Sequence, residues 1–475
     1  MKVSLATTAE YAKLAADSIK DLNPNAADIL ITSVLTSMAT DLGVVSPTSS
    51  GLLTYYDGSL NKANTIDGYF VTPASFNGND HEEHRISLTY GGYVETCKGA
   101  NTFAVPGIYK LLDFVYQNYA SLPLKILFEY PINTLKIGFK LCQPTKDYFV
   151  HSLKPLFSWH NESKSTLAPI IDNIDDGLIK IPKLSSTYEQ MSIVGFNDFY
   201  IGDINNEISS TLQDEGGHAT KDDFKNYELI EGSMFKTNKR GIKIIGHKGP
   251  SIGGLMVLKY LNALSESADL SELKNIYIER KKRFETFKDR QQLVADEINT
   301  ITQSPSTIQV STSDDRNNHF SITFSSGYGS GVLCKNTGMY FNNSLGEIEL
   351  NPQGFLGETY GERLISNMSP LILILNNENV AIGSPGADRI SSSLAQVVNH
   401  KLENKSWKDS IDHARYHVNE DGIVKAEPEV NIEYDDINYT EEFDMYFGGV
   451  CVSGLKNTEV FAYGDKRRSD ISWIN

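Results

Sequence analysis

Three groups of residues in this sequence could do chemistry: a His/Glu cluster, a glycine-rich run and four cysteines. Residues 81–84 (His-Glu-Glu-His) lack the H-E-x-x-H spacing that puts two histidines on one face of a helix. Residues 327–331 (Gly-Tyr-Gly-Ser-Gly) have no lysine and no clear helix after them, which favours a tight turn over a phosphate loop. The cysteines form no C-x-x-C pair, so we expect buried, unreactive thiols. The sequence therefore predicts no metal and no cofactor.

The acidic balance of the chain excludes some classes of partner. Lys and Arg number 43 against 60 Asp and Glu, a formal net charge of −17. Because phosphate backbones and anionic lipid surfaces attract clustered Lys and Arg, we expect neither nucleic acid nor a membrane as partner. No run of about 18 apolar residues occurs, and the first residues lack a signal-peptide core, so we expect a cytoplasmic protein.

Periodicity predicts the elements that must position an active site. Thr7 and Glu10 have capping-box spacing, which predicts a first helix. Apolar residues over 27–38 keep one stripe through a second helix. Residues 255–264 are expected to form a buried helix, and residues 271–291 a charged one.

After a Ser-Pro-Ser break that precedes position 307, the hydrophobic period changes to two. Alternation over 308–311 and 320–324, joined by a polar turn, predicts a β-hairpin. A second hairpin is expected over 371–382, and a helix over 390–398. Helices, then hairpins, then helices again predict an α+β protein whose antiparallel sheets carry helices on their outer faces.

Short motifs run in a fixed order through nearly the whole chain. The most specific covers residues 383–390 (Gly-Ser-Pro-Gly-Ala-Asp-Arg-Ile) and follows residues 366–370 (Ser-Asn-Met-Ser-Pro) closely. The others lie at 25–28, 43–47, 49–51, 104–107, 199–202, 216–217, 250–254, 329–331, 341–347 and 465–468. Each motif is weak alone, but together they resemble the γ-glutamyltranspeptidase (glutathione hydrolase) family.

This resemblance implies an αββα four-layer sandwich, the N-terminal-nucleophile hydrolase fold, made as one precursor. In the family a Thr attacks the preceding peptide carbonyl, the bond shifts to an ester, and hydrolysis frees a new N-terminus. The Thr hydroxyl then becomes the nucleophile, and its own α-amino group, with a pKa of about 7.7–8.0, accepts the proton. The pattern aligns this residue with Thr307, and Ser306 is the alternative one residue earlier. We therefore expect a large-subunit segment 1–306 and a small-subunit segment 307–475 that stay associated as one intertwined domain.

The resemblance also implies roles for residues around the nucleophile. The backbone N–H groups of Gly386 and Ala387 match the family's oxyanion hole, and the Ala in place of a family Gly keeps its backbone donor. Ser325 matches a second hydroxyl that hydrogen-bonds the nucleophile.

A further set of residues is implied to bind the acyl group of the substrate. Ser366 and Asn367 resemble the pair that contacts the α-carboxylate of a γ-glutamyl group. Glu347 is where the family has an acid against the α-ammonium group, and Ser344 belongs to the same motif. Tyr69 departs from the pattern, because the family has an Arg there; Tyr offers one hydrogen bond but neither a charge nor a bidentate fork.

Three functions stay open at this stage. The first is a self-processing hydrolase or acyltransferase for a small γ-glutamyl amide such as glutathione, with hydrolysis favoured over transfer. Tyr69 motivates the second, an amide hydrolase with another acyl group, unless a different arginine such as Arg85 reaches the pocket. The third is a non-enzymatic relative that is never cleaved.

Overall fold

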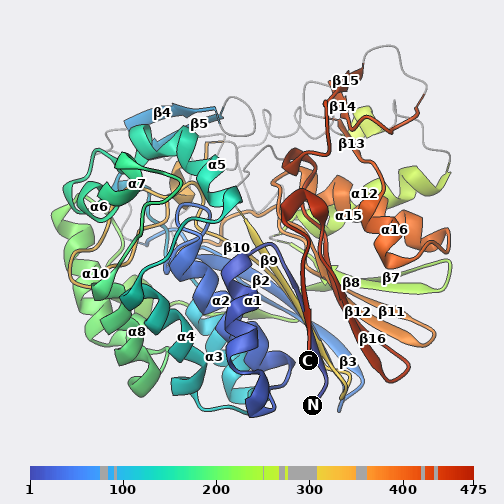
Figure 1. The fold of residues 1–475 in the computed structure, drawn as a ribbon, viewed down its shortest axis with the longest axis horizontal. Coiled ribbons are helices and arrows are strands. Elements are labelled where there is room, and N and C mark those ends of the chain that lie inside the picture. The colour runs from blue at the N-terminus through green and yellow to red at the C-terminus, as the bar shows by residue number, and fades with distance from the viewer. Residues whose placement is uncertain are drawn as a thin grey trace.

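Two large antiparallel sheets stack face to face and carry helices on both outer sides, as Figure 1 shows. The computed structural model describes residues 1–74, 84–89, 94–249, 251–266, 273–276, 307–348, 361–418, 423–432 and 437–475. The expected αββα sandwich is confirmed.

The first sheet has seven strands, drawn from both ends and the middle of the chain. Its order is β18 (Ile471–Ile474), β1 (Val3–Thr7), β9 (Ile308–Asp314), β10 (His319–Ser325), β2 (Ser50–Asp57), β3 (Lys62–Gly68) and β6 (Ile230–Glu231).

The second sheet has six strands. Its order is β17 (Glu459–Tyr463), β16 (Cys451–Lys456), β12 (Glu378–Gly383), β11 (Leu371–Leu375), β8 (Ile242–His247) and β7 (Met234–Lys239). Two small sheets lie apart from it: β13 (Tyr416–Val418), β14 (Val424–Ala426) and β15 (Ile437–Tyr439), and the pair β4 (His84–Leu88) and β5 (Val94–Lys98).

A thick helical layer covers the first sheet, on the left of Figure 1. Leu30 and Val34 of α2 pack there against Val310 and Ile322 of the β9–β10 hairpin. The helices are α1 (Glu10–Ser18), α2 (Ala26–Thr40), α3 (Ile108–Tyr119), α4 (Leu124–Ile137), α5 (Gln143–Ser152), α6 (Asn161–Thr166), α7 (Ala168–Asp172), α8 (Pro182–Val194), α9 (Asp198–Ile201), α10 (Asp203–Asp214) and α11 (Lys221–Lys225).

A thinner layer covers the second sheet, on the right of Figure 1. It contains α12 (Gly253–Glu266), α15 (Arg389–Leu402) and α16 (Trp407–Asp412). Val257 of α12 and Leu394 of α15 share one apolar core with Val380 and Ile382 of β12.

Hydroxyl groups join the two sheets where their inner faces meet. The Ser4 and Ser453 hydroxyls lie 2.9 Å apart, and the Thr54 hydroxyl donates to the Pro370 carbonyl oxygen at 2.6 Å. These bonds satisfy polar groups that would be costly to bury alone.

Most of the expected elements are confirmed: both hairpins, the helix over 27–38 as α2, the helix over 255–264 as α12 and the helix over 390–398 as α15. The predicted cap at Thr7 was wrong. Thr7 ends strand β1 instead, and α1 begins at Glu10 after Ala9. Of the charged helix expected over 271–291, only residues 273–276 lie within the described part, and they are helical.

Candidate active site

Thr307 lies immediately before inner strand β9 and is 4% exposed. In the β9–β10 hairpin Ile308 pairs with Phe324, so one further step of this antiparallel register puts Thr307 opposite Ser325. Ser325 pairs in turn with Ser50 of β2. Three hydroxyl side chains thus form a row at one end of the first sheet.

The alternation along β9 decides which way this row faces. Ile308 and Val310 lie in the apolar core with α2, whereas the Ser311 hydroxyl donates to the Cys451 carbonyl oxygen of the second sheet at 3.2 Å. Successive side chains of a strand point to opposite faces. Thr307 therefore shares the face of Ser311 and points toward the second sheet.

Strand β12 of the second sheet runs toward the end of the first sheet that carries this row of hydroxyls. Its Ile382 carbonyl oxygen accepts a hydrogen bond from the Ser321 hydroxyl at 2.8 Å. One residue later, Gly383 lies so close to Gln309 that a Cβ on it would be 2.2 Å from the Gln309 side-chain oxygen. The turn that follows β12 is thereby carried toward the row of hydroxyls.

That turn presents two backbone donors. It passes through Gly386 (φ 122°) and Ala387 (φ 62°) into α15. Within the described part of the chain, neither N–H group donates a hydrogen bond. Unpaired N–H groups near a helix N-terminus suit an anionic oxygen, which is the requirement of an oxyanion hole.

Side chains on either side hold this turn in its shape. A left-handed conformation costs an Ala roughly 1–2 kcal/mol, so the surroundings must impose it. The Ser384 hydroxyl donates to the Pro385 carbonyl oxygen at 2.8 Å and accepts the Gly449 N–H at 3.1 Å.

Asp388 anchors the other side of the turn. Its carboxylate accepts a hydrogen bond from Arg389 Nη1 at 2.8 Å and lies 3.1 Å from His417 Nε2. The other ring nitrogen, His417 Nδ1, lies 2.9 Å from the Ser392 hydroxyl. All four side chains are buried. His417 comes from β13, so a strand outside the two large sheets braces the turn that contains Gly386 and Ala387.

Glu347 and Ser344 lie beside the hydroxyl row. The Gly327 N–H donates to the Ser325 hydroxyl at 3.0 Å, and a Cβ on Gly327 would be 3.0 Å from Glu347 Oε1. The Ser344 hydroxyl donates to the same carboxylate at 3.3 Å. The tight turn expected over 327–331 is confirmed, and it seats a buried carboxylate next to Ser325.

Tyr69 follows β3 and lies in an apolar cluster with Leu345 and Met368. The Ser366 and Ser344 side chains lie near its hydroxyl and act to lower its pKa. Burial raises the pKa of this hydroxyl, and the charge of Glu347 raises it further. Tyr69 therefore stays neutral and offers no charge to a substrate carboxylate.

Arg363 approaches Tyr69, but its guanidinium group is already engaged in hydrogen bonds and an ion pair within the protein. Nη1 donates to the Tyr69 carbonyl oxygen and to the Tyr227 hydroxyl, and Nε lies 3.5 Å from Asp67. Burial raises the pKa of Asp67, and the Arg363 charge opposes that effect. Arg85, the candidate named from the sequence, is exposed on β4. Neither arginine therefore replaces the arginine that the family has at the position of Tyr69.

The loop of Ser366 and Asn367 is held against the start of α12. The Ile252 N–H donates to the Ser366 carbonyl oxygen at 2.9 Å, and a Cβ on Gly253 would be 2.0 Å from the Asn367 carbonyl oxygen. Only glycine permits this approach. The motif at 250–254 thus supports the pair at 366–367.

The structure groups the predicted residues in two sets. Thr307, Ser325, Gly386 and Ala387 belong to the facing ends of β9, β10 and β12, whereas Tyr69, Ser344, Glu347, Ser366 and Asn367 line one flank of that end. Ser306 lies outside the described residues. The motifs did not single out Arg363 or His417, because the residues that each contacts are distant in the sequence.

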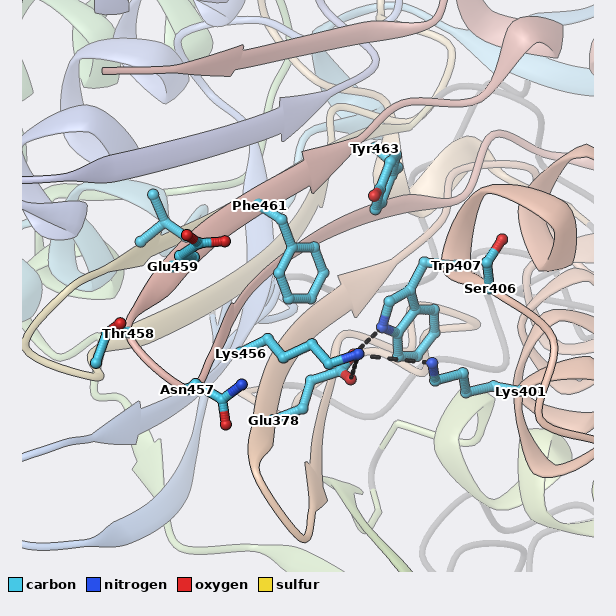
Figure 2. Close-up of a pocket in the computed structure, with 11 residues that line it drawn as sticks. Glu378, Lys401, Ser406, Trp407, Lys456, Asn457, Thr458, Glu459, Phe461 and Tyr463 are labelled. Atoms are coloured by element: carbon cyan, nitrogen blue, oxygen red, sulfur yellow. Dashed lines mark hydrogen bonds and ion pairs between the residues drawn. The ribbon is translucent and has the colours of Figure 1, made fainter.

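A separate cavity of about 600 Å³ opens on the outer side of the second sheet, near α16, as Figure 2 shows. Its buried Glu378 accepts a hydrogen bond from the Trp407 indole N–H and lies 4.0 Å from both Lys401 and Lys456. None of the predicted site residues lines it.

Among the residues that the structure describes, no group of three or more His, Cys, Asp or Glu side chains is placed to hold a metal ion. No helix there is both long enough and apolar enough to span a bilayer. The four cysteines are buried, as expected, and none of them is in a disulfide.

Comparisons with known proteins agree with this geometry. The glutathione hydrolase proenzyme of Bacillus subtilis subsp. natto is 23% identical over 457 residues, covering 81% of this chain and 77% of that protein. The capsule biosynthesis protein CapD proenzyme of Bacillus anthracis is 23% identical over 406 residues, covering 77% and 74%. The crystal structure of cephalosporin acylase from Bacillus halodurans shares the fold, with a TM-score of 0.77 at 18% identity over 100% of this chain and 95% of that one.

A family model described as gamma-glutamyltranspeptidase matches residues 15–298 and 277–472, which together span most of the sequence. The chain therefore belongs to the γ-glutamyltranspeptidase family and is an N-terminal-nucleophile amidohydrolase of the hydrolase/acyltransferase type.

Proposed function

We propose that this protein cleaves itself before Thr307 and then uses Thr307 as the nucleophile of an amide hydrolase. The observation that carries the proposal is that the start of β9 and the turn after β12 lie at the same end of the two facing sheets. Thr307 faces the second sheet from a row of hydroxyls, and the turn after β12 brings to the same end the N–H groups of Gly386 and Ala387, which donate to no described residue.

Self-cleavage would start with attack of the Thr307 hydroxyl on the carbonyl carbon of Ser306. The C–N bond breaks as the acyl group moves to oxygen, and water then hydrolyses the ester. Two chains result, 1–306 and 307–475. Strands of both segments alternate in the first sheet, where β1 lies between β18 and β9, so the chains are expected to stay together.

Substrate turnover would repeat this chemistry with an external amide. The α-amino group of Thr307 takes the hydroxyl proton, the oxygen bonds to the amide carbon, and the proton passes to the departing amine. Water then releases the acyl group. Each backbone donor to the developing oxyanion is typically worth about 10²–10³ in rate.

We propose a γ-glutamyl amide as the first candidate for the substrate. Glu347 is buried beside Ser325, where it would pair with the α-ammonium group. Ser366 and Asn367 would receive the α-carboxylate by hydrogen bonds. Glutathione hydrolases among the relatives favour this reading.

A different acyl group, one with an amine but without the carboxylate, is the second candidate. It is favoured by the neutral Tyr69 in place of an arginine and by the engagement of Arg363 with Asp67 and Tyr227. The likeness to cephalosporin acylase concerns the fold and does not choose between the candidates.

Intact mass and N-terminal sequencing of the purified protein test the first step. Two chains, the smaller starting at Thr307, are expected. A start at Ser306 would move the nucleophile by one residue, and a chain that stays uncut for days at neutral pH would favour a non-enzymatic relative.

Three anilides then test the acyl group: γ-glutamyl, 4-aminobutanoyl, which lacks the carboxylate, and glutaryl, which lacks the amine. Loss of the amine is expected to lower kcat/KM about 10- to 100-fold, as for one charged hydrogen bond. If 4-aminobutanoyl exceeds γ-glutamyl by well over tenfold, the second candidate replaces the first. No turnover of any of the three by cleaved protein would overturn both.

A further inference from the structure

The cavity near α16 is lined by residues that no step of the proposed reaction uses. Its volume of about 600 Å³ falls in the range of about 300–1,000 Å³ that is usual for small-molecule sites. Every residue of its lining belongs to the segment 378–463. The cavity is therefore complete within one chain whether or not the protein is cleaved before Thr307.

One face of three neighbouring strands forms the floor of this cavity. Glu378 of β12 pairs with Lys456 of β16, and Lys456 pairs in turn with Glu459 of β17. Side chains two residues apart on a strand share a face, so Phe461 and Tyr463 lie on the same side of the sheet as Glu459. The floor thus has charged side chains at one end and aromatic ones at the other.

Two ammonium groups share a single carboxylate at the charged end. Lys401 Nζ lies 4.0 Å from one oxygen of Glu378, and Lys456 Nζ lies 4.0 Å from the other. Both distances exceed the usual range of a hydrogen bond, about 2.7–3.2 Å, and neither ammonium group donates to any described residue. The third group that approaches Glu378 is the neutral Trp407 indole, whose N–H donates to it (Figure 2). The cluster therefore carries one positive charge in excess.

Lys401 is the more buried of the two cations. Its side chain is 14% exposed, against 58% for Lys456. Its ammonium group lies 4.8 Å from the centroid of the Trp407 ring. Burial lowers the pKa of Lys401, the charge of Glu378 opposes this effect, and the charge of Lys456 adds to it. An anion between the two lysines would replace the solvation that Lys401 has lost and would use its free donors.

Glu459, the other acidic residue of the lining, does not cancel this excess charge. It is exposed, and in Figure 2 it lies apart from the cluster around Glu378. Lys456 is its partner across the β16–β17 hairpin, but the ammonium group of Lys456 pairs with Glu378 instead. The inner end of the cavity is therefore suited to an anion rather than to a cation.

Aromatic side chains form the remaining wall. The rings of Phe461 and Tyr463 have their centroids 5.9 Å apart and are tilted by 42°. A Cβ on Gly454 would be 2.5 Å from Phe461 Cζ, so the Phe461 ring covers a position of β16 that has no side chain. Both rings are partly exposed, which leaves their surfaces available to a ligand ring that packs against them.

We propose that this cavity binds a small aromatic monocarboxylate. The carboxylate would lie between Lys401 and Lys456 and receive hydrogen bonds from both ammonium groups, while the ring would pack against Phe461 and Tyr463. Glu378 positions the two lysines through its charge. None of the proposed catalytic or acyl-binding residues takes part, so the site binds its ligand independently of self-cleavage and turnover.

Three ligands with the same ring and different charges test the proposal: phenylacetate, phenylacetamide and 2-phenylethylamine. Their affinities for the purified full-length chain are measured by titration with saturation-transfer difference NMR, which detects weak binding. Phenylacetate is expected to bind about 10- to 100-fold more tightly than phenylacetamide, the range of one charge-assisted contact. The amine, which is a cation, is expected to bind no more tightly than the amide.

Substitution of each lysine locates the bound carboxylate. In Lys401→Gln the preference for phenylacetate over phenylacetamide is expected to fall to about threefold or less, and Lys456→Gln, at the more exposed lysine, should lower it by a smaller factor. Lys221→Gln is the matched control, since Lys221 is exposed on α11, outside the cavity, and its side chain bonds no described residue. The control should keep the preference of the wild type.

Three results would overturn the proposal: no binding of phenylacetate at about 10 mM, an affinity for the amide or the amine that equals or exceeds that for phenylacetate, or an unchanged preference in both lysine variants. The last result would mean that the carboxylate binds elsewhere on the protein. If Lys401→Gln does not fold, Lys456→Gln decides together with the three ligands on the wild type. Failure of the proposed hydrolase activity would leave this test unaffected, because it measures binding alone.

Discussion

Substitution of Gly327 by Ala tests whether the turn after β10 seats the carboxylate of Glu347. Gly327 has φ 67°, and an added Cβ would lie 2.4 Å from Asn343 Oδ1 and 3.0 Å from Glu347 Oε1. Gly216 supplies a matched control, since it has φ 79° but nothing within 4 Å of an added Cβ.

Both variants carry the same backbone cost, but only Gly327→Ala also carries a packing cost. Both put an Ala in the left-handed region, at roughly 1–2 kcal/mol. Only Gly327→Ala must also displace Asn343 and Glu347, and overpacking of a buried site costs about 1–3 kcal/mol more. We expect that difference in the free energy of unfolding, measured by urea titration of both variants with tryptophan fluorescence.

Kinetics give the functional half of the prediction. A displaced Glu347 should lower kcat/KM about 10- to 100-fold for acyl groups that carry an amine, and much less for the glutaryl anilide. Equal stability of the two variants would refute the packing argument. A drop that is the same for γ-glutamyl and glutaryl anilides would refute the assignment of Glu347 to the ammonium group.

Three other perturbations have defined outcomes. Thr307→Ala should remain one chain of 52.8 kDa by intact mass, whereas Thr307→Ser, which keeps a hydroxyl, should be cleaved; cleavage of the Ala variant at the same bond would exclude Thr307 as nucleophile. Asp388→Asn leaves the buried Arg389 without its carboxylate and should cost about 3–5 kcal/mol in urea titration and lower kcat, while Asp172→Asn, at an exposed position whose side chain makes no bond within the described residues, should change neither. Burial raises the pKa of Asp41 to about 7, far above its unfolded value, so the stability that this group contributes is fully present below about pH 4 and is lost as the pH rises through 7. The free energy of unfolding, measured by urea titration, should therefore fall from pH 5 to pH 7 by up to about 1.4 kcal/mol per pH unit from this group, and Asp41→Asn should remove that slope; an equal fall in both proteins would rule it out.

Local patterns predicted the elements that carry their own signal. The alternation before and after the polar turn gave the β9–β10 hairpin, and therefore the pairing that puts Thr307 opposite Ser325. The helix over 27–38 was also found, but it is buried on every face rather than along one stripe. Its Thr36 and Ser37 hydroxyls donate to carbonyl oxygens one turn back, which lets polar side chains lie inside the core.

Contacts made by distant residues could not be predicted in this way. No spacing signals that His417 meets Asp388 or that Arg363 pairs with Asp67. Each depends on which strands become neighbours. Thr7 shows the same limit locally: its spacing to Glu10 suits a helix cap, but pairing with Val310 of β9 keeps it in a strand.

The adjacency of the two chain ends allows the cleavage and the catalysis to be separated. β1 and β18 are neighbours, and Val3 and Asn475 exchange backbone hydrogen bonds. A short linker from residue 475 to residue 1 would therefore close the chain into a ring without disturbing the first sheet, and a new opening between residues 306 and 307 would preserve every strand. Such a circular permutant would begin at Thr307 once its initiator Met is removed. Thr307 would then have a free α-amino group from the start, without the self-cleavage that is proposed for the natural chain.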